Sequence, residues 1–362
     1  MKILFLCKRQ YTGRDLLDDR YGRLWELPVG LARLGHEVRV LATSYRRRGV
    51  AEKTESGVVW QSVDALPLLT GVWHRQQAVM REFRPDVILA GSDAVHLVLG
   101  DRLARQHGVP ALLDLYDDYE AFGLTRLPGL KKALRAACAR ANKVIAVSHV
   151  LADLLEMRGT AKRKITVIGN GVPAGFVPDC SSAQARSRLN LPGNDIPLIG
   201  TAGALDDARG IRDLFQAFQR LKQDFPGMRL VLAGPRKRYI ERVFPQGTID
   251  LGQLPHAQVA VLFRALDVGI ICNRDGAFAR SCHPMKLMEM IACGLPVVAA
   301  AIGETEFLLN EYPHSLYAAG NSANLREKIK AQFENRELLP AGLACSWQQA
   351  AEKLNDLLLV SA

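Results

Sequence analysis

The chain of 362 residues is 48% hydrophobic and 23% charged, which excludes an intrinsically disordered protein and is enough for two globular domains of ordinary size. No apolar run reaches the roughly 18 residues of a membrane-spanning helix. The first apolar stretch, Met1–Cys7, is too short for a signal peptide and is interpreted as a buried strand. Seven cysteines are scattered without a C-x-x-C pair, so reduced thiols in the cytoplasm are favoured over disulfides or a zinc site.

The net charge of +10 is concentrated in the first half of the chain. Residues 1–180 hold 27 Lys and Arg against 19 Asp and Glu, a balance of +8, whereas residues 181–362 hold 20 against 18. A basic first half suits an anionic partner, such as an acidic membrane surface or a phosphorylated acceptor. Nucleic acid is not predicted as a partner, because the basic residues lack the interleaved aromatic residues on which bases stack.

Strands and helices alternate along the first half of the chain, and a polar loop is expected at residues 8–19, after the first strand. Such strand–helix–strand units form right-handed parallel crossovers, so the pattern predicts a doubly wound parallel sheet. The expected strands are residues 2–7, 37–42, 87–90, 111–115, 144–147 and 165–168, and the expected helices are 20–34, 95–107, 130–142 and 150–157.

A turn-rich stretch at residues 170–182 interrupts this alternation, and the domain boundary is placed there. The predicted fold class is therefore α/β, with two Rossmann-like domains, 1–180 and 181–342, that face each other across a cleft. An amphipathic helix is expected within 343–362, with Ser346 as its N-cap. In the second domain the expected strands are 197–203, 228–233, 249–251, 268–272 and 297–301, and the expected helices include 211–225 and 258–264.

The stretch Ser281–Glu306 is the most informative, and its pattern indicates a helix, a glycine turn and a buried strand. Lys286 and Glu289 lie about one helical turn apart in it, and therefore on one face of the helix. A surface ion pair would explain them. Alternatively, Lys286 and the helix start behind Pro284 would bind a phosphate, while Glu289 accepts hydrogen bonds from sugar hydroxyls. A phosphate joined to a ribose is the simplest ligand that uses both.

Other candidate residues lie on loops that follow strands, because ligands of open parallel sheets bind at the carboxyl ends of the strands. Arg209 opens a helix after a strand and could pair with a diphosphate, although a solvated arginine is the simpler interpretation. Asp114 and Asp117 could orient a substrate or act as acid and base, or else form an acidic helix cap. Asp206 and Asp207 could bind magnesium but are more typical of turns and caps.

A basic helix is expected at residues 130–144. It could lie on an acidic membrane surface, or it could pack through its apolar face and leave its basic face in solvent. Its basic residues are Lys131, Lys132, Arg135, Arg140 and Lys143.

The run Gly294–Ala299, with the sequence GLPVVA, resembles a motif of the retaining nucleotide-sugar glycosyltransferases of family four, which have the two-domain GT-B fold. The resemblance covers nearly the whole chain, with its motifs in the expected order and spacing. It implies that the final helix, opened by Trp347, returns to the first domain. The other matching segments are Gly35–Val38, Val144–Ser148, Asn170–Val172 with Phe176, Gly203–Gly210, Gly234-Pro235 and Leu251-Gly252.

The resemblance implies roles for residues of both domains. Glu289 would hold the ribose of the donor, and the segment Pro284–Leu287 would offer backbone amides to its phosphate or sugar. Arg209 and Lys286 would act in catalysis by neutralising the departing nucleoside diphosphate, and Tyr116 and Asp117 would orient the donor sugar or the acceptor. The full set of implied donor-binding residues is Gly203, Arg209, Gly234, Pro284, Lys286, Leu287, Glu289, Gly303 and Glu306.

The chain also departs from the family pattern. Ser281 stands where the first of two glutamates is usual, Ala204 where an arginine is usual, and Tyr116 where a histidine is usual. The segment Pro284–Glu289 instead resembles the Pro-x-Lys-x-x-Glu pattern of a divergent branch. These departures leave open a non-catalytic relative that binds nucleotide sugar or a partner. A less favoured alternative is a nucleotide-sugar epimerase on the same fold.

The interpretation that follows is a retaining, metal-independent glycosyltransferase of the hexosyltransferase type. It would move a sugar from a UDP- or GDP-sugar to a saccharide or lipid-linked acceptor in the synthesis of cell-surface polysaccharides or glycoconjugates. Such a transfer requires positioning and stabilisation of the leaving diphosphate more than a protein nucleophile, so no cofactor is expected besides the nucleotide-sugar co-substrate. The expected location is the cytoplasm, with peripheral contact at the inner membrane face.

Overall fold

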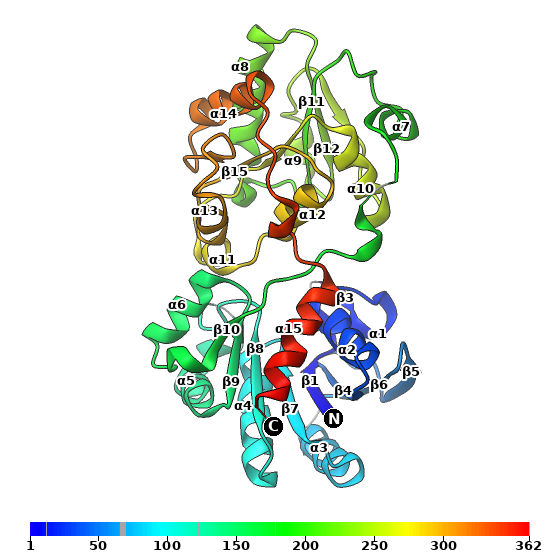
Figure 1. The fold of residues 1–362 in the computed structure, drawn as a ribbon, viewed down its shortest axis with the longest axis vertical. Coiled ribbons are helices and arrows are strands. Elements are labelled where there is room, and N and C mark those ends of the chain that lie inside the picture. The colour runs from blue at the N-terminus through cyan, green and yellow to red at the C-terminus, as the bar shows by residue number, and fades with distance from the viewer. Residues whose placement is uncertain (12, 66–69, 122, 178, 362) are drawn as a thin grey trace. The chain divides into compact units, whose positions relative to one another are not determined.

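The computed structural model describes residues 1–361 apart from 12, 66–69, 122 and 178, and it divides into two compact units (Figure 1). Unit 1 consists of Met1–Gly171, Ser281–His283 and Ser346–Ala362, and unit 2 consists of Val172–Arg280 and Pro284–Cys345. The division after Gly171 differs from the predicted boundary after residue 180. The reason is that Val172, Phe176 and Cys180 are buried in the apolar core of unit 2, so most of the turn-rich stretch packs with the second sheet.

Unit 1 is built on an eight-stranded sheet in the order β10-β9-β8-β7-β1-β4-β6-β5. Neighbouring strands run parallel except β5 and β6, which are antiparallel, so the predicted doubly wound parallel sheet is confirmed. The strands are β1 Lys2–Lys8, β4 Glu37–Ser44, β5 Ala51–Glu55, β6 Val58–Asp64, β7 Val87–Gly91, β8 Ala111–Leu115, β9 Lys143–Ala146 and β10 Ile165–Val167.

The centre of this sheet is apolar because helices cover both of its faces. Every residue of β7 and β8 is buried, as expected for parallel strands packed on two sides. The edge strand β5 is part-exposed along its whole length, which explains why its polar sequence gave no strand prediction. The helices of unit 1 are α1 Leu16–Asp19, α2 Arg23–Arg33, α3 Thr70–Phe83, α4 Ala94–His107, α5 Leu130–Arg140, α6 His149–Met157 and α15 Trp347–Leu359.

The polar loop expected at residues 8–19 was a wrong prediction. The segment forms a short hairpin, in which β2 Gln10–Tyr11 pairs with β3 Arg14–Asp15, and then the single turn α1. Asp15 stabilises this arrangement twice. Its carboxylate accepts a hydrogen bond from the Leu17 N–H as the cap of α1, and it forms an ion pair with Arg9 at 2.9 Å.

Unit 2 contains a six-stranded, all-parallel sheet in the order β13-β12-β11-β14-β15-β16. Its strands are β11 Leu198–Ala202, β12 Arg229–Ala233, β13 Thr248–Asp250, β14 Val268–Ile271, β15 Val297–Ala300 and β16 Leu316–Tyr317. Its helices are α7 Ser182–Arg188, α8 Ile211–Asp224, α9 Arg238–Glu241, α10 His256–Ala265, α12 Met285–Ala292, α13 Glu304–Leu309, α14 Ser322–Glu334 and α11 Ala277–Ser281, of which only the last residue belongs to unit 1.

Alternating side chains of these strands fill two apolar clusters, one on each face of the sheet. Leu198 and Val297 pack with residues of α10 and α12, whereas their neighbours Ile199 and Val298 pack with residues of α8 and α14. Both faces are therefore covered, and the loops at the carboxyl ends of the strands remain as the places for a site.

The C-terminal helix α15 belongs to unit 1, where it packs along α2 (Figure 1). Ser346 is its N-cap, as predicted, and accepts a hydrogen bond from the Gln349 N–H while the Gln349 side chain accepts one from the Ser346 N–H. The two helices approach closely at Gly30, where an added Cβ would lie 2.4 Å from the Cβ of Ala351. Glycine at this position therefore sets the distance between α2 and α15.

Candidate functional site

Two glycine turns meet at the carboxyl ends of β11 and β12 in unit 2. Gly203 and Gly234 adopt φ values of 140° and 139°, a conformation that L side chains rarely adopt. A Cβ on Gly234 would lie 1.9 Å from the Gly203 carbonyl oxygen, and the Leu205 N–H donates to the Pro235 carbonyl at 3.0 Å. The structure thus brings together the two loops that sequence analysis selected separately.

Helix α12 begins beside Pro284 and carries the predicted lysine and glutamate. Leu287, Met288 and Ile291 are buried, so the helix is fixed by its apolar face, and Gly294 with φ 67° follows its end as expected. Its N-cap residue, Pro284, makes no side-chain capping hydrogen bond. The start of α12 is therefore held in place by packing of its apolar face.

Lys286 and Glu289 form an ion pair on α12, with the lysine Nζ 2.6 Å from Oε2 of the glutamate. Their predicted location on one helix face is confirmed. The Glu289 side chain is 1% exposed, whereas that of Lys286 is 34% exposed. The pair is therefore not the solvated surface pair that sequence analysis offered as the simpler explanation, because a buried carboxylate requires its partners.

His256 completes this cluster, and sequence analysis missed it. Its Nε2 lies 3.0 Å from Oε1 of Glu289, and its ring centre lies 4.8 Å from that of Phe176. His256 is the first residue of α10 and follows β13 after a short loop, which places it at the same carboxyl edge of the sheet. Its position after a strand was the signal that could have selected His256. Its contact with Glu289 could not be foreseen, because the two residues are 33 apart in sequence.

Arg209 lies on a short 3₁₀ turn, Asp207–Arg209, that follows β11, and its side chain is exposed. Its N–H is bonded to Oδ1 of Asp206 at 2.8 Å, and Asp207 forms an ion pair with Arg212 at 2.6 Å. Asp206 thus caps the turn and Asp207 forms an ion pair, which agrees with the expectation that both are structural residues of a turn. The predicted second phosphate ligand, Lys286, is bonded to Glu289.

The turn after β15 holds the two remaining predicted donor residues. Gly303 has φ 54°, and an added Cβ there would lie 2.1 Å from the Arg280 carbonyl oxygen, so glycine is required for the close approach. Glu306 is exposed on α13. Glu304, which sequence analysis passed over, is the buried carboxylate of this turn.

Asp114 is a buried structural residue, contrary to the role considered for it in substrate orientation or acid–base chemistry. It forms an ion pair with Arg23 at 2.7 Å, and both side chains are 0% exposed. The same guanidinium donates to the carbonyl oxygens of Ile168 and Gly169 at 2.9 and 3.1 Å. The Arg23–Asp114 pair therefore links α2, β8 and the segment after β10 within unit 1.

Tyr116 and Asp117 follow β8, where sequence analysis placed them. The Tyr116 hydroxyl donates to the Ser92 carbonyl at 3.0 Å, and burial raises the pKa of its phenol well above the ordinary value. Burial also raises the pKa of Asp117 to about 6, although a hydrogen bond from the Asp118 N–H opposes the shift. Asp117 is therefore a carboxyl group that titrates just below neutral pH.

Ser92, which follows β7, forms hydrogen bonds with residues at the ends of β1 and β8. It is fully buried and has φ 87°, which is a strained conformation for a residue other than glycine. Its hydroxyl accepts a hydrogen bond from the Lys8 N–H at 2.7 Å, and its carbonyl accepts the one from Tyr116. The Lys8 ammonium lies 5.8 Å from the centre of the Tyr116 ring.

Asp93, the next residue, is bonded to the Tyr45 hydroxyl at 3.0 Å and to His96 Nδ1 at 2.8 Å. Burial opposes ionisation of this carboxyl group, but His96 and Lys8 lower its pKa to about 2. The His96 side chain is itself buried. Sequence analysis did not select Ser92 or Asp93, because their partners come from other strand ends.

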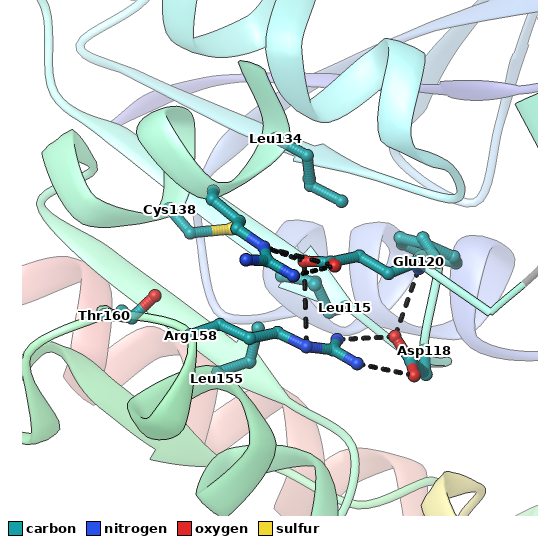
Figure 2. A pocket seen from close by; sticks show the side chains of 10 residues that line it. Leu115, Asp118, Glu120, Leu134, Cys138, Leu155, Arg158 and Thr160 are labelled. Atoms are coloured by element: carbon teal, nitrogen blue, oxygen red, sulfur yellow. Dashed lines mark hydrogen bonds and ion pairs between the residues drawn. The ribbon is translucent and has the colours of Figure 1, made fainter. Parts of the chain in front are cut away.

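A network of ion pairs fixes the rest of the loop after β8. Arg158 binds both oxygens of Asp118 at 2.6 and 2.9 Å (Figure 2). Arg135 binds Glu120 at 2.7 Å. The cavity beside these residues has a volume of about 10 Å³, room for about one water molecule. The network therefore anchors the loop that carries Asp117 and does not form a ligand pocket.

A larger hollow of about 360 Å³ lies in unit 2 beside Cys293 and Gly294. These residues follow the C-terminal end of α12, and Lys286 lies at its N-terminal end. The described residues that line the hollow, among them Arg264, Asp267 and Arg336, differ from the cluster of Lys286, Glu289 and His256. Among the residues that the structure describes, no group of three or more His, Cys, Asp or Glu could hold a metal ion.

Two family domains match the chain. Residues 23–176 match the Glycosyltransferase Family 4 domain, and residues 196–335 match the Glycosyl transferases group 1 domain. The chain belongs to the glycosyltransferases that combine these two domains, which confirms the predicted family. The two parallel-sheet α/β units are those of the GT-B glycosyltransferase fold.

One curated relative is the GDP-mannose-dependent alpha-mannosyltransferase of Mycolicibacterium smegmatis, which is 28% identical over 296 residues, or 75% of this chain and 73% of that protein. The chain spans about half the length of two other curated relatives. It covers 51% of the putative teichuronic acid biosynthesis glycosyltransferase TuaC of Bacillus subtilis, at 27% identity, and 52% of the D-inositol 3-phosphate glycosyltransferase of Streptosporangium roseum, at 24% identity.

Solved structures of low sequence identity share the fold. Sucrose-phosphate synthase from Thermosynechococcus elongatus is 19% identical with a TM-score of 0.77, and 100% of both chains is covered. HepE of Anabaena in complex with UDP is 19% identical with a TM-score of 0.71, covering 99% of this chain and 95% of that one. At these identities the likeness extends to the fold alone.

Proposed function

We propose that this chain is a retaining glycosyltransferase that transfers a hexose from a UDP- or GDP-sugar to a saccharide or lipid-linked acceptor. One observation carries the proposal: a buried carboxylate, Glu289, is bonded to Lys286 in the first turn of α12. A lysine and a helix start can bind a phosphate, and a carboxylate can accept hydrogen bonds from ribose hydroxyls. A nucleoside diphosphate presents both groups.

The glycine turns would let the diphosphate approach the backbone. Gly203 has open space where a side chain would stand, and Gly234 lets the loop after β12 pack against it. Gly303 in the same way lets the turn after β15 pack against the Arg280 carbonyl. Arg209 is exposed on the turn after β11 and would supply a second positive charge. At the start of α12, Pro284 has no N–H and its carbonyl accepts the Leu287 N–H at 2.9 Å, so the backbone donors to a phosphate would be the N–H groups of Met285 and Lys286 that lie between them.

The proposed transfer breaks the bond between the sugar and the diphosphate while the acceptor hydroxyl attacks from the same face. Negative charge grows on the departing phosphate, and Lys286, Arg209 and the first N–H groups of α12 would stabilise it. The proton of the acceptor hydroxyl passes to the departing phosphate oxygen. In this proposal side chains and backbone amides supply the positive charge, so the reaction uses no metal ion or other cofactor.

Unit 1 would supply Asp117 and Tyr116 for orientation of the reacting sugars. With a pKa of about 6, Asp117 is mostly ionised at pH 7 and can accept hydrogen bonds from sugar hydroxyls. The Tyr116 phenol keeps its proton and donates to Ser92, so its role is to hold the loop. In this proposal Asp117 would position a sugar, Tyr116 would hold the loop that carries Asp117, and neither would act as a nucleophile.

A lipid-linked acceptor for cell-surface polysaccharide or glycoconjugate synthesis would be met in the cytoplasm at the inner membrane face. Support comes from Lys131 and Lys132, which are exposed on α5, and from Leu127, which is 56% exposed just before that helix. Other basic residues of α5 are engaged, since Arg140 pairs with Asp101 at 2.6 Å. Among the described residues, no helix is long and apolar enough to cross a membrane.

The test of this proposal is a thermal unfolding series with UDP, GDP, ADP and CMP. A nucleotide present at about 100 times its dissociation constant stabilises the protein by about 2.7 kcal/mol, which shifts the melting temperature visibly. We expect a shift with UDP or GDP that is lost in Glu289→Gln and kept in the exposed control Glu311→Gln. Nucleotide release from the matching sugar donor, over a panel of acceptors, then tests transfer.

The second candidate is a non-catalytic relative that binds nucleotide sugar, and Ser281 favours it. This residue replaces the usual first glutamate, is buried in unit 1, and its carbonyl accepts a hydrogen bond from the Ser148 hydroxyl at 2.6 Å. Position 281 thus contributes to packing without a carboxylate. A nucleotide-dependent melting shift without turnover on any acceptor would favour this second function.

A further inference from the structure

His256 contacts the proposed ribose ligand from a different element of unit 2. Glu289 lies on α12 and has both carboxylate oxygens engaged, Oε1 by His256 Nε2 at 3.0 Å and Oε2 by Lys286 Nζ at 2.6 Å. An ionised carboxylate can accept hydrogen bonds but cannot donate them. His256 is therefore the donor in this contact, through its Nε2–H. Each oxygen keeps a further lone pair for a ligand hydroxyl.

The two partners differ in how firmly they hold the carboxylate. Lys286 is on the same helix as Glu289, and its long chain allows its ammonium to turn towards another anion. His256 has a short side chain at the start of α10, with its ring 4.8 Å from that of Phe176. Phe176 is itself buried in the core of unit 2. The imidazole is therefore the better anchored of the two donors.

The exposed fractions place both partners at the outer edge of the cluster. The side chains of His256 and Lys286 are 28% and 34% exposed, and that of Glu289 is 1% exposed. A ribose that approaches from solvent would therefore meet His256 and Lys286 before it reaches the carboxylate. If the ammonium of Lys286 turns to the phosphate, Oε2 becomes available to a ribose hydroxyl while Oε1 stays bonded to His256.

We propose that His256 is a positioning residue that holds Glu289 for the ribose hydroxyls and thereby gives the site its preference for ribonucleotides over 2′-deoxyribonucleotides. This inference rests on the proposed function, in which Glu289 binds the ribose of the donor. Without the Nε2–H donor, the carboxylate can turn towards Lys286 and loses its orientation towards the sugar. The loss then falls on the hydroxyl-dependent part of binding and leaves the phosphate-dependent part in place.

The test measures binding of four probes by calorimetry: UDP, GDP and their 2′-deoxy forms. The wild-type protein is expected to prefer the ribose form of its nucleotide by roughly tenfold or more, because hydrogen bonds to a charged group are strong. In His256→Phe, which keeps a ring against Phe176 but lacks the donor, we expect this preference to fall to about twofold. Affinity for the deoxy form stays within about twofold of wild type.

Two further variants separate positioning from folding. His256→Gln retains an N–H donor and is expected to restore most of the preference for ribose. Gln258→Ala changes an exposed residue of the same helix and is expected to bind all four probes as wild type does. Melting temperatures without ligand show whether each variant is folded.

The outcomes divide clearly. An undiminished preference for ribose in His256→Phe, or equal weakening of the ribose and deoxy forms, overturns the inference and leaves the proposed function standing. A wild-type protein that binds none of the four probes overturns the proposed function and this inference with it. Loss of the preference in His256→Phe, with its return in His256→Gln, supports the positioning role.

Discussion

The ammonium of Lys286 lies 2.6 Å from the carboxylate of Glu289, and the glutamate is the buried member of the pair. Removing one partner of such a pair leaves a buried charge with less compensation. A phosphate that approaches the start of α12 would offer the ammonium a second anion, and the two can share its three N–H donors. The pair thus connects the phosphate and ribose parts of the proposed ligand.

Lys286→Met is expected to weaken nucleoside diphosphate binding by roughly 10- to 100-fold, because the variant loses a charge-assisted hydrogen bond to phosphate. Binding of the nucleoside without phosphate should change much less. Calorimetry with UDP and uridine, or GDP and guanosine, measures both effects. Lys330→Met is the matched control, since Lys330 also pairs with a glutamate on a helix of unit 2 but lies on α14. Equal losses for nucleotide and nucleoside would contradict the role of Lys286 at the phosphate.

The Arg23–Asp114 ion pair gives a prediction on stability. Both side chains are fully buried, so Asp114→Asn is expected to lower the free energy of unfolding by about 3–5 kcal/mol. The comparison is Lys2→Met, which removes an exposed ion pair with Glu37 at 4.0 Å and should cost at most about 1 kcal/mol. Urea unfolding of the full chain measures both. Similar values for the two variants would show that the buried pair adds nothing beyond a surface one.

The fold was predictable where the sequence repeats a local pattern. Apolar runs such as Val87–Gly91 and Ala111–Leu115 are buried at every residue, so composition alone identifies them as central strands. The edge strand β5 and the short hairpin after β1 were missed because their residues are mostly polar and take their structure from neighbours. A domain boundary in a turn-rich stretch is also set by packing, as Phe176 illustrates by entering the core of unit 2.

The candidate site was predictable only where its residues lie close together in the sequence. Lys286 and Glu289 are three residues apart, so helical geometry alone places them on one face. His256 and Glu289 are 33 residues apart, and Arg23 and Asp114 are 91 apart, so only the folded sheets bring them together. For that reason the sequence indicated the local pair correctly, missed the histidine and left open a substrate role for Asp114.

Asp117 gives a prediction on pH. Its pKa is raised from 3.8 to about 6, so between these values the folded state holds a proton that the unfolded state has lost. The stability contributed by this group is therefore full below about pH 4 and is lost as pH rises through about 6, a change of at most about 3 kcal/mol. Asp117→Asn should remove this decline. Unfolding free energies of wild type and variant at pH 4, 5, 6 and 7 measure the difference, with the exposed Asp153→Asn as control. Parallel profiles for wild type and Asp117→Asn would exclude a raised pKa.

Gly234 gives the sharpest prediction on the loops. An added Cβ would lie 1.9 Å from the Gly203 carbonyl oxygen, and the φ of 139° is unfavourable for alanine. Gly234→Ala is therefore expected to lower the free energy of unfolding by about 1–3 kcal/mol and to displace the two turns, so nucleotide binding should weaken as well.

Gly342→Ala is the control, because nothing lies within 4 Å of its added Cβ and its φ lies outside the positive range. That variant should be as stable as wild type or slightly more stable. Urea unfolding together with calorimetry on UDP and GDP measures both effects. Nucleotide affinity that survives in Gly234→Ala at full strength would separate the glycine turns from the binding site.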